Sequence, residues 1–371
     1  MLPDLTDPDL GARPDPDLDR WVAARLPCDV VHLDVAACGR PSSAVLEAQG
    51  RHLRAEAAGG GYVAEAAAAG LVAAGRDRVG GLLGLAGADV ALVDSAGTAF
   101  ADLLEAWPYG AGARVGTVSS EYGANALVLH RVAAARGWTL VPLPVDDVGR
   151  VQEVSAGLDL VTFPQVASQR GIAQPVHDVL REGVPLLLDV AQSLGQVAVP
   201  AGCAAYVGTS RKWLCGPRGI GFLAVDPAVG PALVRPPTLS PYDDLRRFDA
   251  QETHVAGRVG LAVAAQEWTP AVLPVVAARS AYARQLLGQA LGSTPWRVVE
   301  PVDEPTGITT LVGGDPVAVR AALLARGLLV SAVPASRAPD LDAPVLRIST
   351  GAWARDAELD AIAAALRLVT A

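Results

Sequence analysis

Lysine is almost absent from this chain. Among its 30 Lys and Arg residues, Lys212 is the only lysine. Both side chains serve as solvated surface charges, but only an amine can lose its proton near neutral pH and attack a carbonyl group. We therefore interpret Lys212 as a residue that carries chemistry.

Cysteine and histidine are also scarce. The four cysteines, Cys28, Cys38, Cys203 and Cys215, show no CxxC spacing, and the five histidines lie far apart. A structural zinc site needs such residues in close pairs, so this pattern predicts no metal site. We expect the cysteines to be reduced and partly buried.

Basic runs and long apolar runs are missing as well. The net charge is −9, and no stretch is basic enough to follow a phosphate backbone, so no nucleic-acid partner is expected. The longest charge-free stretch, residues 190–210, contains Gln, Gly and Pro and does not fit a membrane-spanning helix. The first twenty residues are acidic and Pro-rich, unlike a signal peptide. They predict a loose arm and a cytoplasmic protein that does not bind membranes.

What the sequence does contain is an alternation of short β-rich runs with Ala- and Leu-rich helical stretches. This pattern predicts an α/β domain, from about 35 to 235, with a mostly parallel sheet. The expected strands cover residues 88–94, 113–120, 139–145, 158–164, 184–191, 204–210 and 219–225, and the helices between them cover 98–107, 125–137 and 175–183.

A second region follows this domain. Residues 236–258 are rich in loop-forming residues, and an Ala-rich helix is expected from about 259 to 292. The remainder alternates strand and helix again, so 236–371 is predicted to be a smaller C-terminal α/β domain. Residues 1–34 are predicted to be an N-terminal arm that contributes to this smaller domain.

One candidate phosphate site lies at Ser95-Ala96-Gly97-Thr98. A buried strand runs into these residues and a helix begins at once, so free backbone N–H groups and a hydroxyl converge at the positive end of the helix. The alternative is an ordinary helix start capped by Ser or Thr.

A second candidate group follows two later strands. Asp189 ends an apolar strand, with Gln192 three residues on, and Lys212 follows 23 residues after Asp189, behind another short strand. Because α/β folds bind ligands at the carboxyl ends of parallel strands, both side chains are expected to emerge at one sheet edge. Taken alone, Asp189 is equally explained as a helix cap or turn residue.

A phosphate cup, then an acid, then a lysine is the order found in pyridoxal phosphate (PLP) enzymes of fold type I. The local motifs resemble the class V aminotransferase group over nearly the whole chain. They are "VHLDVAACGRPSSAV" (31–45), "SAGT" (95–98), "SSEYGAN" (119–125), "DVAQS" (189–193), "TSRKWLCGPRGIGF" (209–222) and "VLRIST" (345–350).

The resemblance implies PLP as cofactor and a role for each matching residue. Lys212 would bind the cofactor covalently and later move the substrate's Cα proton. Asp189 would keep the pyridine nitrogen protonated, and Gln192 would bond to the phenolic oxygen. Arg347 would pair with the substrate carboxylate. The residues implied for the phosphate are Gly97, Thr98, Thr209 and Arg211.

Three positions depart from the group's pattern. Tyr122 stands where many members stack a His on the cofactor ring, and Tyr is the poorer proton donor near neutrality. Ser168, or its neighbour Gln169, would take the role of the group's Asn. Arg258 stands where a partner-subunit Thr often reaches the phosphate, so the role of Arg258 across a subunit boundary stays open.

The reaction is narrowed by the absence of any cysteine after Cys215, because a cysteine desulfurase needs a late, mobile thiol to accept sulfur. The segments 60–66 and 204–219 resemble the PLP-dependent C–S lyases of ergothioneine biosynthesis. That likeness implies hercynylcysteine sulfoxide, a cysteine S-conjugate, as substrate and a homodimer as the working form. Another class V enzyme (a desulfurase, epimerase or aminotransferase) or a non-catalytic protein of this fold remains the alternative.

The implied substrate carries a trimethylammonium group, which aromatic faces bind well. Tyr62 is the first candidate for that contact, ahead of Trp213 and Trp353, and each is alternatively a packing residue.

Overall fold

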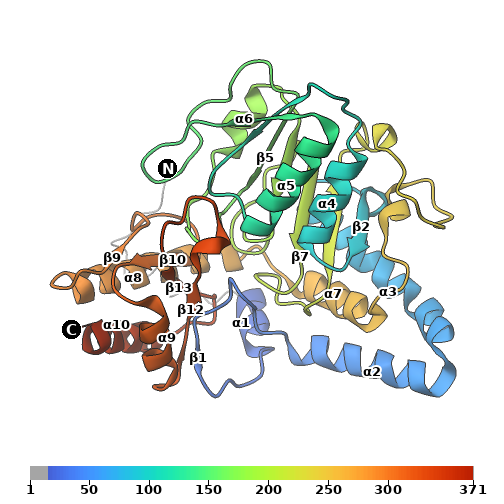
Figure 1. Cartoon of the computed structure of the whole chain (residues 1–371). Helices are drawn as coiled ribbons and strands as arrows, with labels where there is room; N and C mark the ends of the chain where they lie inside the picture. Colours follow the sequence, from blue (N-terminus) through green and yellow to red (C-terminus); the bar gives the residue numbers. More distant parts are fainter. Residues whose placement is uncertain (1–15, 371) are drawn as a thin grey trace.

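The computed structural model describes residues 16–370, and its centre is a seven-stranded sheet (Figure 1). The strand order is β2-β8-β7-β6-β5-β3-β4, in which β8 runs antiparallel to both of its neighbours and all other pairs are parallel. The strands are β2 (Val90–Val93), β3 (Arg114–Thr117), β4 (Thr139–Pro142), β5 (Leu160–Pro164), β6 (Leu186–Asp189), β7 (Ala205–Thr209) and β8 (Gly221–Val225). The seven strands expected from the sequence are therefore confirmed.

Both faces of this sheet are buried, as the apolar strand sequences require. On β6, Leu187 faces one core cluster while Leu186 and Leu188 face the other, in accord with the two-residue repeat of a strand. The first cluster lies under α4 (Ala96–Ala106) and α5 (Gly123–Arg136), which cover the sheet in Figure 1. The second includes residues of α3 (Gly61–Leu82), α6 (Val176–Arg181) and α7 (Val255–Glu267).

A second, antiparallel sheet has the order β12-β13-β10-β9 and packs with three helices around its own apolar cluster. Its strands are β9 (Arg297–Val298), β10 (Ile308–Val312), β12 (Ser331–Val333) and β13 (Val345–Ser349), and its helices are α8 (Val272–Leu291), α9 (Pro316–Leu324) and α10 (Asp356–Thr370). These elements match the expected C-terminal alternation of strand and helix.

The N-terminal segment joins this second sheet's side of the molecule. Strand β1 (Val31–His32) pairs in parallel with β11 (Leu328–Leu329), and Asp34 bridges to Ser349. Of the expected loose arm, residues 1–15 lie outside the described residues, whereas Pro16–Ala23 forms the helix α1. The domain limits 1–34, 35–235 and 236–371 stay a prediction. Helix α7 lies within the predicted limits 236–371 of the smaller domain. It nevertheless packs on α2 (Ser43–Gly59) and α3, beside the large sheet.

The single helix expected from 259 to 292 is wrong. The structure has two helices, α7 and α8, which meet at 85° across residues 268–271. Pro270 lies in this break, where its ring and missing N–H prevent a continuous helix. By contrast, Pro274 is tolerated because it lies in the first turn of α8, where backbone N–H groups have no intrahelical partner.

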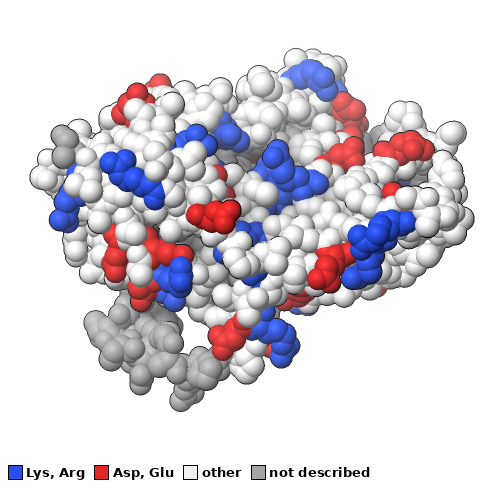
Figure 2. Space-filling view, turned by 90° about the horizontal axis from the view of Figure 1, so that it is seen from below, with Lys and Arg blue, Asp and Glu red and all other residues white. Residues whose placement is uncertain are grey.

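Within residues 16–370, no single helix is long and apolar enough to cross a membrane, and only the bent pair α7–α8 reaches that length and composition together. The face of the molecule in Figure 2 carries positive and negative side chains interspersed, with one group of positive side chains near its middle.

Candidate active site

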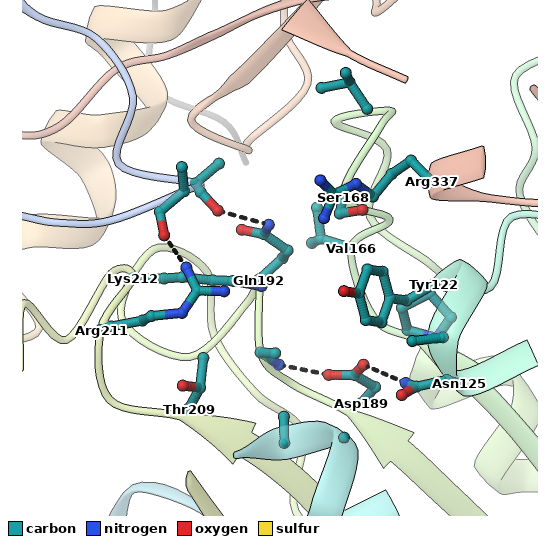
Figure 3. Close-up of a pocket in the computed structure, with 18 of the residues that line it drawn as sticks. Tyr122, Asn125, Val166, Ser168, Asp189, Gln192, Thr209, Arg211, Lys212 and Arg337 are labelled. Carbon is teal, nitrogen blue, oxygen red and sulfur yellow. Dashed lines mark hydrogen bonds between the residues drawn. The ribbon is translucent and has the colours of Figure 1, made fainter. Parts of the chain in front are cut away.

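A cavity of about 390 Å³ lies where the carboxyl ends of β5, β6 and β7 meet the first turn of α4 and the edge strand β12 (Figure 3). Its position agrees with the general location of ligand sites in parallel α/β sheets. Nine of the residues predicted from the sequence line it together: Gly97, Tyr122, Ser168, Asp189, Gln192, Thr209, Arg211, Lys212 and Arg347.

Lys212 is half-buried and lines this cavity. Burial lowers the pKa of Lys212 to about 7, and the charges of Arg211 and Arg347 act in the same direction, while the carboxylate of Asp189 opposes them. A lysine with this pKa is substantially neutral at physiological pH and can therefore act as a nucleophile or a base. Lys212 and Asp189 lie close enough for each to perturb the pKa of the other.

Asp189 belongs to a buried pair of carboxyl groups that one amide connects. Asn125 Nδ2 donates to Asp189 Oδ2 at 3.0 Å and to Glu121 Oε1 at 3.2 Å, and the Ala191 N–H donates to Asp189 Oδ1 at 2.7 Å. Burial, followed by the proximity of Asp189, raises the pKa of Glu121. Burial also raises the pKa of Asp189, but Lys212 and two hydrogen-bond donors counteract it. Glu121 also accepts two hydrogen bonds, so the difference between the two carboxyl groups is Lys212, whose charge favours the ionised form of Asp189.

The first turn of α4 is open toward the cavity. Ser95 caps the helix by accepting a hydrogen bond from the Thr98 N–H at 3.0 Å, which leaves the N–H groups of Ala96 and Gly97 without an intrahelical partner. A Cβ at Gly97 would meet only Ser95 Oγ, at 3.7 Å, so no described protein atom fills the space beside it. Thr98 does not line the cavity; it is exposed, and its hydroxyl lies 3.0 Å from that of Ser95.

A glycine on β8 allows this turn to lie against the sheet. A Cβ at Gly221 would lie 2.3 Å from the carbonyl carbon of Ser95 and 2.7 Å from the Ala96 nitrogen. Thr209, at the end of the neighbouring strand β7, and Arg211 line the cavity beside this turn. Arg211 donates a hydrogen bond to the Ala37 carbonyl. Two backbone N–H groups and a guanidinium thus form one anion-binding corner, beside the Thr209 hydroxyl, which donates to the Ile220 carbonyl at 3.2 Å.

The amide of Gln192 is held at both ends. Its Nε2 donates to the Ala36 carbonyl at 3.0 Å, and its Oε1 accepts from the Trp213 indole at 3.0 Å. One N–H of the amide stays available to the cavity. The same contact identifies Trp213 as a packing residue: it is buried and does not line the cavity.

Arg347 lines the cavity from β13. It donates to the Ser168 carbonyl at 2.8 Å and lies 3.4 Å from Asp34 Oδ1, and burial lowers its pKa to about 10. Ser168 and Gln169 were the two alternatives for the role of the family's Asn. Of these, Ser168 lines the cavity. The Gln169 amide points elsewhere, donating to the Ser120 carbonyl and to Asp340 Oδ1.

Three residues of this site were not predicted from the sequence. Glu121 precedes the N-cap of α5 and Asn125 lies in its first turn, four residues later, so that the two side chains meet. Both belong to the segment already chosen for Tyr122, so this spacing was an available signal. Arg337 lies in a loop without a motif; it lines the cavity and places its guanidinium 5.5 Å from the centre of the Tyr122 ring.

Other predicted residues lie away from the cavity. Tyr62 is 80% exposed on α3 and does not line it. Trp353 stacks on Trp21 at 5.7 Å. Arg258 donates to the carbonyls of Leu92 and Ala250 at 3.0 and 2.6 Å, within its own chain.

Among residues 16–370, no three His, Cys, Asp or Glu side chains are grouped as metal ligands would be.

The chain is similar to known proteins over most of its length. Residues 31–291 match the family model described as "Aminotransferase class-V". The chain is 41% identical, over 95% of its length and 93% of the relative's, to a Mycobacterium tuberculosis protein named "Probable hercynylcysteine sulfoxide lyase". It is 34% identical to a cysteine desulfurase of Dickeya dadantii, over 39% of this chain and 41% of that protein.

Solved structures show the same fold. A cysteine desulfurase from Escherichia coli superposes with a TM-score of 0.81 at 18% identity, covering 95% of this chain and 98% of the other. The fold-type-I expectation and the resemblance drawn from the sequence motifs are therefore confirmed. The chain belongs to the class V aminotransferase family, a family of pyridoxal phosphate enzymes.

Proposed function

We propose that this protein is a C–S lyase that cleaves hercynylcysteine sulfoxide by β-elimination. In that reaction the substrate loses its Cα proton, the Cβ–S bond breaks, and the sulfur leaves as the sulfenate of ergothioneine. The remaining three-carbon enamine takes up water and gives pyruvate and ammonia. The observation that carries the general reaction is the low-pKa amine of Lys212 beside the buried carboxylate of Asp189. The narrower substrate rests on the 41% identical relative.

The residues present fit PLP by their chemistry. The corner formed by the α4 turn, Thr209 and Arg211 suits the phosphate, and an anionic Asp189 suits a protonated pyridine nitrogen. Tyr122 offers an aromatic face, and Gln192 offers one free N–H for the phenolic oxygen. When bound, PLP supplies an electron sink conjugated to the substrate's Cα.

The chain's own residues supply the remaining functions. The neutral amine of Lys212 accepts the proton from Cα, which a lysine of ordinary pKa, protonated at neutrality, does not do. Arg347 lines the cavity from β13, and its guanidinium can hold the substrate carboxylate with two parallel hydrogen bonds. Its existing contacts, the Ser168 carbonyl and Asp34, fix the guanidinium before the substrate arrives.

A cysteine desulfurase is the second candidate, favoured by the partial match to the Dickeya dadantii protein. It requires a thiolate that accepts sulfur near Lys212. Cys38 is the cysteine next to the lining residue Ala37, and burial raises the pKa of its thiol despite the nearby Arg211 and Arg218. Cys215 and Cys203 are buried, with pKa values raised to about 11 and about 12. These neutral thiols favour a reaction in which sulfur leaves on the product.

We also propose a homodimer. Helices α2 and α3 expose five large apolar side chains: Leu46, Leu53, Tyr62, Val63 and Leu71. Such a surface is typical of an interface. In this proposal Tyr62 contacts the partner subunit, and light scattering of the purified protein should give twice the mass of the chain. A cytoplasmic location stays a prediction.

The test is an assay of pyruvate release. The purified protein with PLP should release pyruvate from hercynylcysteine sulfoxide far faster than from cysteine, alanine or aspartate, and Lys212→Ala should release none. Release of alanine and protein-bound persulfide from free cysteine would instead identify a desulfurase. A requirement for a keto acid would identify an aminotransferase.

A further inference from the structure

Two arginines of the cavity, Arg211 and Arg337, form no ion pair with any carboxylate of the described residues, and Arg337 is the one that lies away from the phosphate corner. It ends the short 3-10 turn Ala335–Arg337, is half-buried, and lines the cavity with its guanidinium near the Tyr122 ring. Arg347 pairs with Asp34, and Arg170 outside the cavity pairs with Asp340. Among the described residues, no Asp or Glu forms an ion pair with Arg337.

The cavity therefore holds more positive than negative charge. Its lining includes three arginines, Arg211, Arg337 and Arg347, besides Lys212, but Asp189 is the only acid among the lining residues that the structure describes. The charges lie close enough for Arg337 to lower the pKa values of Lys212 and Arg347. In the proposed reaction the cofactor phosphate uses Arg211 and the amino acid's carboxylate uses Arg347. Arg337 is then the cation without an assigned anion.

The position of Arg337 separates it from the phosphate corner. In Figure 3, Arg337 and Tyr122 lie on the opposite side of the cavity from Thr209 and Arg211. The turn that carries Arg337 packs against the start of α5: a Cβ at Gly123 would lie 2.4 Å from the Ser336 carbonyl oxygen. This close approach fixes the loop beside the cavity. Arg337 also follows β12, whose Ser331 is paired in register with Arg347 on β13.

We propose that Arg337 binds a second carboxylate, one carried by the side chain of the substrate, so that the enzyme prefers cysteine S-conjugates with a distal carboxylate. This inference rests on the proposed function, in which an amino acid is held by Arg347 and reacts at Lys212. It also deepens that function, since the betaine part of hercynylcysteine sulfoxide contains a carboxylate as well as the quaternary ammonium. A guanidinium binds a carboxylate through two parallel hydrogen bonds, so it can fix the distal end of such a substrate.

The kinetic test compares two cysteine sulfoxide conjugates that differ only in a distal carboxylate or its carboxamide. The wild-type protein should prefer the carboxylate by roughly ten- to hundredfold in kcat/KM, the range expected for a hydrogen-bonded charged group. Arg337→Gln should lose most of that preference, and Arg337→Lys should keep part of it. Using the ratio of the two substrates removes any effect of Arg337 on the Lys212 pKa. Arg218→Gln, an exposed arginine outside the lining, should leave the ratio unchanged.

A binding measurement tests the same subsite without turnover. Calorimetry with succinate, glutarate and adipate, each against its monoamide, should find a dicarboxylate that binds the wild-type holoenzyme more tightly than its monoamide, with the difference lost in Arg337→Gln. Equal ratios for wild type and Arg337→Gln in both experiments would overturn the inference. Activity without a carboxylate preference would refute only this subsite, whereas absence of pyruvate from every conjugate would refute the proposed function.

Discussion

Asn125 donates a hydrogen bond to Asp189, from Nδ2 to Oδ2 at 3.0 Å, and its second N–H is used by Glu121. The two carboxyl groups are buried beside one another, so at most one of them is readily ionised. Through this bridge, the helix start that carries Tyr122 also holds the Asp189 carboxyl group in place at the cavity.

We expect Asn125→Ala to weaken PLP binding roughly ten- to hundredfold, because a hydrogen bond to a charged group contributes about 1.5–3 kcal/mol. Titration of the apoprotein with PLP, followed by absorbance, measures this change. Gln174→Ala is the matched control, because Gln174 is a buried amide that bonds to backbone outside the cavity. Wild-type affinity in Asn125→Ala would contradict the role of the bridge.

Gly221→Ala should loosen the phosphate corner. The added Cβ would lie 2.3 Å from the carbonyl carbon of Ser95, so β8 or the α4 turn must move. Such overpacking costs about 1–3 kcal/mol. We expect a lower Tm and weaker binding of PLP. Gly230→Ala is the control, because its new Cβ meets no atom within 4 Å. Its Tm and its affinity for PLP should stay as in wild type. Equal behaviour of Gly221→Ala and Gly230→Ala would refute the packing argument.

The low pKa of Lys212 sets the pH dependence of PLP uptake. Only the neutral amine attacks an aldehyde, so the rate of PLP uptake by the apoprotein should rise with pH and level off above about 7. Arg337→Gln removes a positive charge that lowers this pKa and should shift the midpoint to higher pH. A midpoint near the ordinary lysine value of about 10.4 would contradict the burial argument.

Cys38→Ala distinguishes the two candidate reactions. Because its thiol has a raised pKa and the proposed sulfur leaves on the product, the variant should release pyruvate at the wild-type rate. The measurement is pyruvate release together with mass spectrometry of the protein for bound sulfur. Loss of activity together with loss of a wild-type persulfide would favour a desulfurase.

The sequence predicted the site well wherever its residues follow a buried strand. Asp189 ends an apolar run, so the strand pattern itself pointed to it, whereas Thr209 and Tyr122, at and after the ends of other strands, were assigned through their resemblance to the class V motifs. Helices α2 and α3 were not identified, although their alanine content favours helix. Several of their large apolar residues are exposed, so these helices lack the single core-facing apolar stripe on which the prediction depended.

The contacts of Arg337 and Tyr62 could not be predicted from local pattern. Arg337 reaches the cavity because its loop packs on Gly123, more than two hundred residues earlier in the chain. Tyr62 is near a matched motif, yet α3 carries it to the outer surface. In both cases the tertiary arrangement, rather than the neighbouring residues, determines what the side chain meets.

The most direct test of the account is peptide mapping by mass spectrometry after the PLP-bound protein is reduced with borohydride. Because Lys212 is the only lysine, the account predicts one phosphopyridoxyl group per chain, on the peptide that contains Lys212, and none in Lys212→Ala. A protein that stays unmodified, or carries the group only on its N-terminal amine, would contradict it.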